Sequence, residues 1–121
     1  MTKAKAKGKI TIAPDVLISI ARLSTLSVAG VTSLASNAGG VNRWFEKGLS
    51  EGVQISVEDN KVYADIYVVL KPDINVLDIS HTIQHQVARA ISEMVGMDVG
   101  KVNIHVEDIE IKSSMLPSNA I

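Results

Sequence analysis

Residues 75–111 read NVLDISHTIQHQVARAISEMVGMDVGKVNIHVEDIEI, and this stretch decides the fold. In its first part the apolar side chains recur at helical spacing and form one stripe: Val76, Ile79, Ile83, Val87, Ala90, Ile91 and Met94. Polar side chains take the opposite side: Asp78, His81, His85, Arg89 and Glu93. After Gly96 the period changes to two, and the apolar residues Val102, Ile104 and Val106 alternate with polar ones. The stretch predicts an amphipathic helix followed by a strand, and both need a sheet to pack against.

Residues 53–70 supply that sheet. Val53, Ile55 and Val57 alternate with polar residues, and the same alternation returns over residues 62–70. Between the two runs, Asp59 and Asn60 are residue types that favour a tight turn. The pattern predicts a β-hairpin. Asn75, with Asp78 three residues later, then suits the start of the helix.

The N-terminal part of the chain predicts a short strand, a helix and a weak strand. Ile10 and Ile12 indicate a strand over residues 9–12, and Pro14 suits the first position of a helix that runs to about Ser27. The residues expected on its core side follow helical spacing: Val16, Leu17, Ile20, Leu23 and Ser27. Residues 28–34 indicate a loosely defined strand.

The element order is therefore β-α-(β)-β-β-α-β. We expect a two-layer α+β sandwich, with a mainly antiparallel sheet and both long helices on one face, because each helix has a single apolar side. The domain is expected to span residues 9–111, between a basic flexible tail at residues 1–8 and a flexible tail at residues 112–121. The apolar residues of the last strand move from even positions, up to Val106, to odd positions at Ile109 and Ile111. This change in the alternation predicts a bulge near Glu107 and Asp108.

Composition excludes several classes of protein. The chain of 121 residues contains no cysteine, which removes disulfides, thiolate zinc sites and cysteine nucleophiles. No apolar run reaches the roughly 20 residues of a spanning helix, so we expect no direct membrane span. Lys3, Lys5, Lys7 and Lys9 hold four of the twelve basic charges, and the remaining eight face thirteen acidic side chains. An acidic body argues against nucleic acid as a partner.

His81 and His85 stand one helical turn apart on the polar side of the long helix. This spacing can chelate a transition metal, and Asp78 lies one turn before His81. The glutamate of a zinc-protease helix is replaced by Thr82. The two histidines are thus weak metal candidates, and a solvated polar face is the simpler interpretation.

The best partner-binding candidates lie on strands. If both helices cover one side of the sheet, the other side presents Tyr63 and Tyr67 of the hairpin together with Asn103 and His105 of the last strand. Such a face suits a protein partner. An alternative is an RNA-binding module in which Tyr63, Tyr67 and His105 stack on bases, although the sequence signature of RNA-recognition motifs is absent.

Trp44 and Phe45 are the only Trp and the only Phe, and they lie on an expected helical turn between basic residues. They are either an exposed anchor for a partner or a cap on one end of the core. No glycine-rich phosphate loop, nucleophile motif or identifiable carboxylate pair is present, so we predict no catalytic residue, no enzyme activity and no cofactor.

Five segments together resemble the alkaline shock protein family of bacterial envelope stress proteins. They are GKITIAPDVL at residues 8–17, VAGV at 28–31, DIYVVL at 65–70, VARAISEMVG at 87–96 and VNIHV at 102–106. The resemblance covers residues 8–111 and implies a cytoplasmic, non-catalytic protein that self-associates. It also implies contact with the membrane through a separate anchor protein. We therefore expect a stress-response protein that acts through protein contacts as a homo-oligomer.

Overall fold

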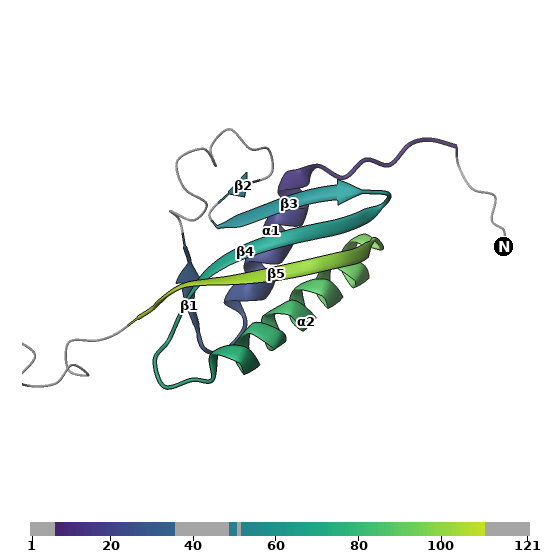
Figure 1. Cartoon of the computed structure of the whole chain (residues 1–121). Coiled ribbons are helices and arrows are strands. Elements are labelled where there is room, and N and C mark those ends of the chain that lie inside the picture. The colour runs from purple at the N-terminus through teal and green to yellow at the C-terminus, as the bar shows by residue number, and fades with distance from the viewer. Residues whose placement is uncertain (1–6, 36–48, 51, 111–121) are drawn as a thin grey trace, which may run out of the picture.

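The computed structural model describes residues 7–35, 49–50 and 52–110, and they form a sheet with two helices packed against it (Figure 1). The elements in chain order are α1 (Pro14–Leu26), β1 (Val31–Leu34), β2 (Leu49–Ser50), β3 (Val53–Glu58), β4 (Lys61–Leu70), α2 (Val76–Val95) and β5 (Asp98–Ile109). The predicted two-layer α+β fold, with both helices on one face, is confirmed.

β4 is the central strand of a five-stranded sheet. On one side it pairs in antiparallel fashion with β3 and, beyond the end of β3, with β1. On the other side it pairs with β5 in parallel along its length. Three of the four pairings are antiparallel, as predicted. The parallel β5 follows from the connection, because α2 carries the chain back to the end where β4 began.

Local sequence explains the element boundaries. Asp59 and Asn60 have φ angles of 52° and 63°, the left-handed conformation of a tight hairpin turn. The side chain of Asn75 accepts a hydrogen bond from the Asp78 N–H at 3.0 Å and caps α2, and Gly96 ends this helix in the left-handed conformation. The turn at Asp59 and Asn60, the start of α2 at Asn75 and the end of this helix at Gly96 were all predicted from the sequence.

The register of β5 shifts twice. Val68 lies opposite Val106, whereas the next residue, Val69, lies opposite Asp108. Glu107 is thus an extra residue in the strand, which confirms the predicted bulge. Gly100 is a second extra residue, between the pairs Val62–Val99 and Tyr63–Lys101.

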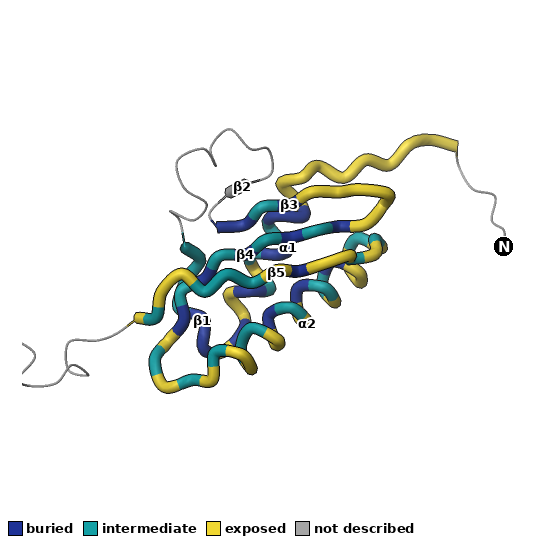
Figure 2. Tube along the Cα trace, viewed as in Figure 1, coloured by how far each residue is buried: buried dark blue, intermediate teal, exposed yellow. Residues whose placement is uncertain are grey.

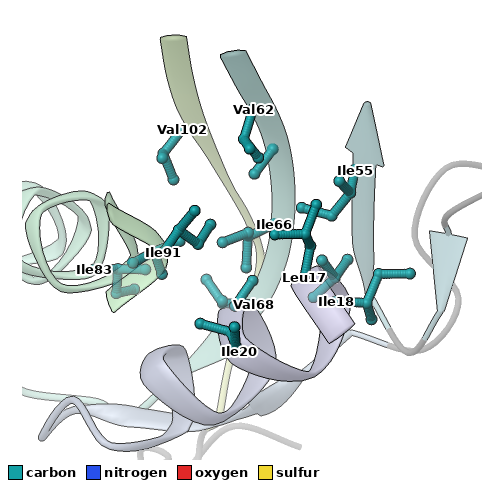
Figure 3. Close-up of a cluster of buried hydrophobic side chains, with 14 of the residues drawn as sticks. Leu17, Ile18, Ile20, Ile55, Val62, Ile66, Val68, Ile83, Ile91 and Val102 are labelled. Atoms are coloured by element: carbon teal, nitrogen blue, oxygen red, sulfur yellow. The ribbon is translucent and has the colours of Figure 1, made fainter. Parts of the chain in front are cut away.

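The core lies between the sheet and the helices. The alternate β4 residues Val62, Ala64, Ile66, Val68 and Leu70 are all 0 % exposed. They meet Leu17, Ile18 and Ile20 of α1 and Ile83 and Ile91 of α2 (Figure 3). Full burial of an aliphatic side chain of this size contributes about 1.5–3 kcal/mol, so this cluster dominates the stability of the fold.

Two sequence predictions about the N-terminal part are wrong. Residues 9–12 form no strand and belong to an exposed segment before α1 (Figure 2). Ile10 is 90 % exposed. Both sides of β4 are already paired, and Pro14 begins α1 only two residues after Ile12. In α1 the rotational phase differs from the prediction, since Leu23 is 62 % exposed. The buried residues are Leu17, Ile18, Ile20, Ala21 and Thr25.

The side of α1 that carries Ala21 and Thr25 faces the core. Both residues are 0 % exposed, and Ala21 belongs to the hydrophobic cluster. The Thr25 hydroxyl donates to the Ala21 carbonyl at 2.7 Å, which satisfies a polar group that burial would otherwise make costly. In α2, Met94 was expected in the core stripe but is 72 % exposed, because it lies in the last turn, beyond Ile91, the last fully buried residue of the helix.

Candidate interaction surface

The sheet surface opposite the helices is called the outer face here. It consists of alternate side chains of three strands: Gln54 and Ser56 of β3, Tyr63, Asp65 and Tyr67 of β4, and Lys101, Asn103 and His105 of β5. The register places Tyr63 beside Lys101, Asp65 beside Asn103 and Tyr67 beside His105. The β4 members are half-buried by their neighbours on the sheet, and no helix of the described residues covers them (Figure 2).

Asp65 is the centre of this face. Its Oδ1 atom accepts a hydrogen bond from the Asn103 side-chain amide at 3.2 Å and lies 2.9 Å from His105 Nε2. An ionised carboxylate can only accept, so Nε2 is the protonated ring nitrogen of His105. The side chains of His105 and Asp65 are 40 % and 35 % exposed, so solvent screens their attraction. The contacts therefore orient the three side chains more than they stabilise the fold.

Tyr67 completes the cluster. Its ring is stacked on the His105 ring, with centroids 4.4 Å apart and an interplanar angle of 15°. His105 is thus held both through its ring face and through its ring edge. A polar and aromatic cluster with fixed side chains is a typical feature of binding surfaces, because little conformational entropy is lost on contact.

Tyr63 lies against the backbone of β5. A Cβ atom added to Gly100 would lie 2.4 Å from Tyr63 Cε2, so the tyrosine ring occupies the space that the glycine leaves. The sequence prediction missed Gly100. A glycine inside a strand often marks such a close approach, and this was the available signal.

The structure brings together Tyr67, Asn103 and His105 around Asp65 and places Tyr63 on the same face. Their role in partner binding stays a prediction. Trp44 and Phe45, with the expected helical turn around them, lie outside the described residues.

The helix face has a different character. His81 Nδ1 lies 3.2 Å from Gln84 Oε1, and His81 and His85 are both exposed. Within the described ranges, no three His, Asp or Glu side chains are placed to hold a metal ion. Arg89 Nε donates to Glu93 Oε2 at 2.9 Å, and this hydrogen bond, with the charge of Glu93, raises the pKa of Arg89 above its ordinary value. These contacts are those of a solvated helix surface.

Two of the hollows on the described part of the chain are relevant to function. One, of about 360 Å³, lies between α2 and β5 and is lined by Gln84, Ala88 and residues 99–103. The other, of about 490 Å³, is lined mainly by apolar side chains, including Ile10, Ile12 and Val57. Neither hollow is lined by a pair of titratable side chains placed for acid and base catalysis.

The fold and the outer face define a small two-layer α+β domain that covers one side of its sheet with helices and presents a polar and aromatic cluster on the other. The chain belongs to the ASP23 (alkaline shock protein) family, which has a cell envelope-related function and which matches residues 2–111. The resemblance seen in the sequence is thereby confirmed.

Similar proteins occur in Streptococcus and Bacillus. The uncharacterized protein Spy1535 of Streptococcus pyogenes is 37 % identical over 111 residues, which cover 91 % of this chain and 85 % of that protein. The uncharacterized protein YqhY of Bacillus subtilis is 26 % identical over 105 residues, or 85 % of this chain and 78 % of that protein.

Among solved structures, variants of the MamM C-terminal domain share the fold. A triple variant has a TM-score of 0.54 at 12 % identity and covers 79 % of this chain and 95 % of its own. A single variant has a TM-score of 0.52 at 13 % identity, with coverage of 81 % and 100 %. At this identity the likeness concerns the fold alone. Across the described residues, neither helix has the length and apolarity needed to cross a membrane.

Proposed function

We propose that this chain is a non-enzymatic protein of the envelope stress response that binds protein partners through its outer face and self-associates near the membrane. The observation that carries the proposal is the cluster of Asp65, Tyr67, Asn103 and His105, which is ordered by its own contacts. The family's cell envelope-related function gives the setting.

A protein partner fits the outer face better than RNA does. The carboxylate of Asp65 lies at the centre of the face, where it would repel a phosphate backbone. Tyr67 and His105 are stacked on each other, so one face of each ring is already occupied. A protein surface can instead donate hydrogen bonds to Asp65 and pack against the aromatic rings.

A catalytic role has less support than a binding role. The Asp65–His105 pair resembles the two orienting members of a hydrolytic triad, but such a pair acts only beside a positioned nucleophile, and the sequence carries no nucleophile motif. We propose a cytoplasmic location, with contact to the membrane made by a protein partner rather than by this chain.

Affinity capture with matched variants tests the proposal. The tagged chain, its Tyr67→Ala/His105→Ala variant and a His81→Ala/His85→Ala control are each incubated with lysate and with detergent-solubilised membranes of the source organism. Each double variant removes two ring side chains that solvent can reach. Tyr67 and His105 lie on the outer face, whereas the control residues His81 and His85 lie on α2. We expect one set of proteins to be retained by the original chain and by the control, and lost by the outer-face variant.

Retention of the same proteins by all three baits would contradict the proposal. RNA is the alternative outcome: a labelled single strand that is shifted at low salt by the original chain, and not by the outer-face variant, would assign the face to nucleic acid instead.

A further inference from the structure

β5 forms an open edge of the sheet. It pairs with β4 on one side, and none of the described strands pairs with its other side (Figure 1). An edge strand presents unpaired N–H and C=O groups, which can bind another strand. β5 is the longest of the described strands, at 12 residues, so its open edge offers many backbone groups for pairing.

One hydrogen bond shows which backbone groups face outward. The side-chain amide of Gln84, on α2, donates to the Val102 carbonyl at 2.9 Å. This carbonyl therefore points away from β4. Because successive backbone groups alternate, those of Ile104 and Val106 point the same way. Beyond the bulge at Glu107, the Glu110 N–H donates to Leu70 of β4, which fits a reversal of the alternation at the extra residue.

The edge has few of the features that prevent strand pairing. Between the bulges at Gly100 and Glu107 it contains no proline, and its inward side chains are apolar. Val102 is buried and lines the hollow between α2 and β5, whereas Ile104 and Val106 remain half-buried. The Gln84 side chain occupies one acceptor position of the Val102 carbonyl, and a carbonyl can accept a second hydrogen bond.

We propose that the occupant of this edge is a second copy of the chain, whose β5 pairs in antiparallel fashion about a two-fold axis at Ile104. This inference names the interface for self-association and rests on that part of the proposed function. In an antiparallel pair, directly opposite residues share a face of the sheet, so Val102 lies opposite the partner's Val106.

Charge selects this register. With the axis at Ile104, Lys101 lies level with the partner's Glu107, the extra residue at the end of the regular stretch, and the symmetry creates this charge pair twice. Asn103 then lies opposite the partner's His105. Moving the axis to Asn103 would place Lys101 opposite the partner's His105 and lose both attractive pairs. Lys101 and Glu107 are exposed, so both are available for the contact.

A charge-reversal series on the purified full chain tests the interface. The variants are Lys101→Glu, Glu107→Lys and the double variant, with Lys71→Glu as a control because Lys71 is also exposed and lies outside β5. Sedimentation velocity is measured from about 1 µM to about 1 mM, since pairing over one short strand stretch buries little area and gives weak association.

We expect a monomer–dimer equilibrium for the original chain and for the control. Each single variant should weaken the dimer at least about tenfold, because two attractive pairs are replaced by two repulsive ones. The double variant should restore the dimer. An equimolar mixture of the two single variants should also restore it, as a heterodimer, because both of its charge pairs are attractive.

Hydrogen exchange locates the contact. The amides of Val102, Ile104 and Val106 should become slower to exchange as the protein concentration rises. A chain that stays monomeric throughout, or a dimer that is insensitive to the single changes, would overturn the inference. The assay contains no other protein, so its failure would leave the partner-capture test of the outer face unaffected.

Discussion

Gly30 offers a sharp test of how α2 is packed on the α1–β1 connection. It is buried, with a φ angle of +104°, and a Cβ atom added there would lie 2.9 Å from Ile79 Cδ1 and 3.3 Å from Ile79 Cγ1. Gly96 provides a matched control, because its φ angle is +79° but no heavy atom lies within 4 Å of the added Cβ. The two glycines share backbone strain, and only Gly30 has the steric conflict.

The expected costs follow from this difference. An alanine in the left-handed region costs about 1–2 kcal/mol, which is the whole expected effect of Gly96→Ala. For Gly30→Ala the conflict with Ile79 adds about 1–3 kcal/mol of overpacking. Ile79 can shift partly because Cδ1 is the end of a flexible side chain, so we expect a total of about 3 kcal/mol for Gly30→Ala. A domain with about 5–15 kcal/mol of stability remains folded after either change.

Urea unfolding followed by far-UV circular dichroism measures both free energies. A double-mutant cycle with Ile79→Val isolates the conflict, because valine lacks the Cδ1 atom. In the Gly30→Ala background, Ile79→Val should recover about 1 kcal/mol, whereas alone it should cost about 0.5–1.5 kcal/mol. Equal costs for Gly30→Ala and Gly96→Ala, or no coupling to Ile79, would refute the packing described here.

Three further predictions concern the core, the outer face and the helix face. Ile66→Ala should lower the free energy of unfolding by about 2–5 kcal/mol, against less than about 0.5 kcal/mol for Leu77→Ala, which is 69 % exposed in the structure; urea titrations would show the contrast or contradict it. Gly100→Ala should displace the Tyr63 ring, changing the near-UV circular dichroism while altering stability by less than about 1 kcal/mol; an unchanged tyrosine signal would disprove the contact. Zinc should leave the melting temperature unchanged, because the two α2 histidines lack a third ligand among the described residues, and a zinc-dependent rise that is lost when both are replaced by alanine would show otherwise.

The strongest sequence patterns gave the most accurate predictions. The hairpin and α2 carry long periodic runs with clear turn and cap residues, so one phase is strongly preferred over the others. In α1 almost every position from Val16 to Leu23 is apolar or small, and two phases fit nearly equally well. The structure turns Ile18, Ala21 and Thr25 toward the core and leaves Leu23 exposed, and this choice depends on tertiary packing. The short run at Ile10 and Ile12 had no partner strand, and alternation alone did not reveal this.

The sequence predicts which residues share the outer face, but it does not predict the hydrogen bonds between them. Parity along each strand places Tyr63, Tyr67, Asn103 and His105 on one side once the helices occupy the other. The hydrogen bonds to Asp65 depend on the register between β4 and β5, and the extra residue Gly100 shifts that register. A bulge at a glycine has only a weak sequence signal, so the cluster became visible only in three dimensions.

The edge and the outer face are physically linked in the proposed dimer. Asn103 and His105 belong to the outer-face cluster and also lie on the strand at the seam, so pairing places the clusters of both copies next to each other. The two Asp65 residues would be separated by three strand spacings, or about 14 Å, across the sheet and by two residues, or about 7 Å, along it. A partner helix, about 10–12 Å across, can then contact both clusters at once. Binding of such a partner would favour the dimer, and dimer formation would raise the affinity for the partner by the same factor, because linked equilibria are reciprocal. A weak edge contact would in this way become significant only where partner molecules are concentrated, as they would be at a membrane.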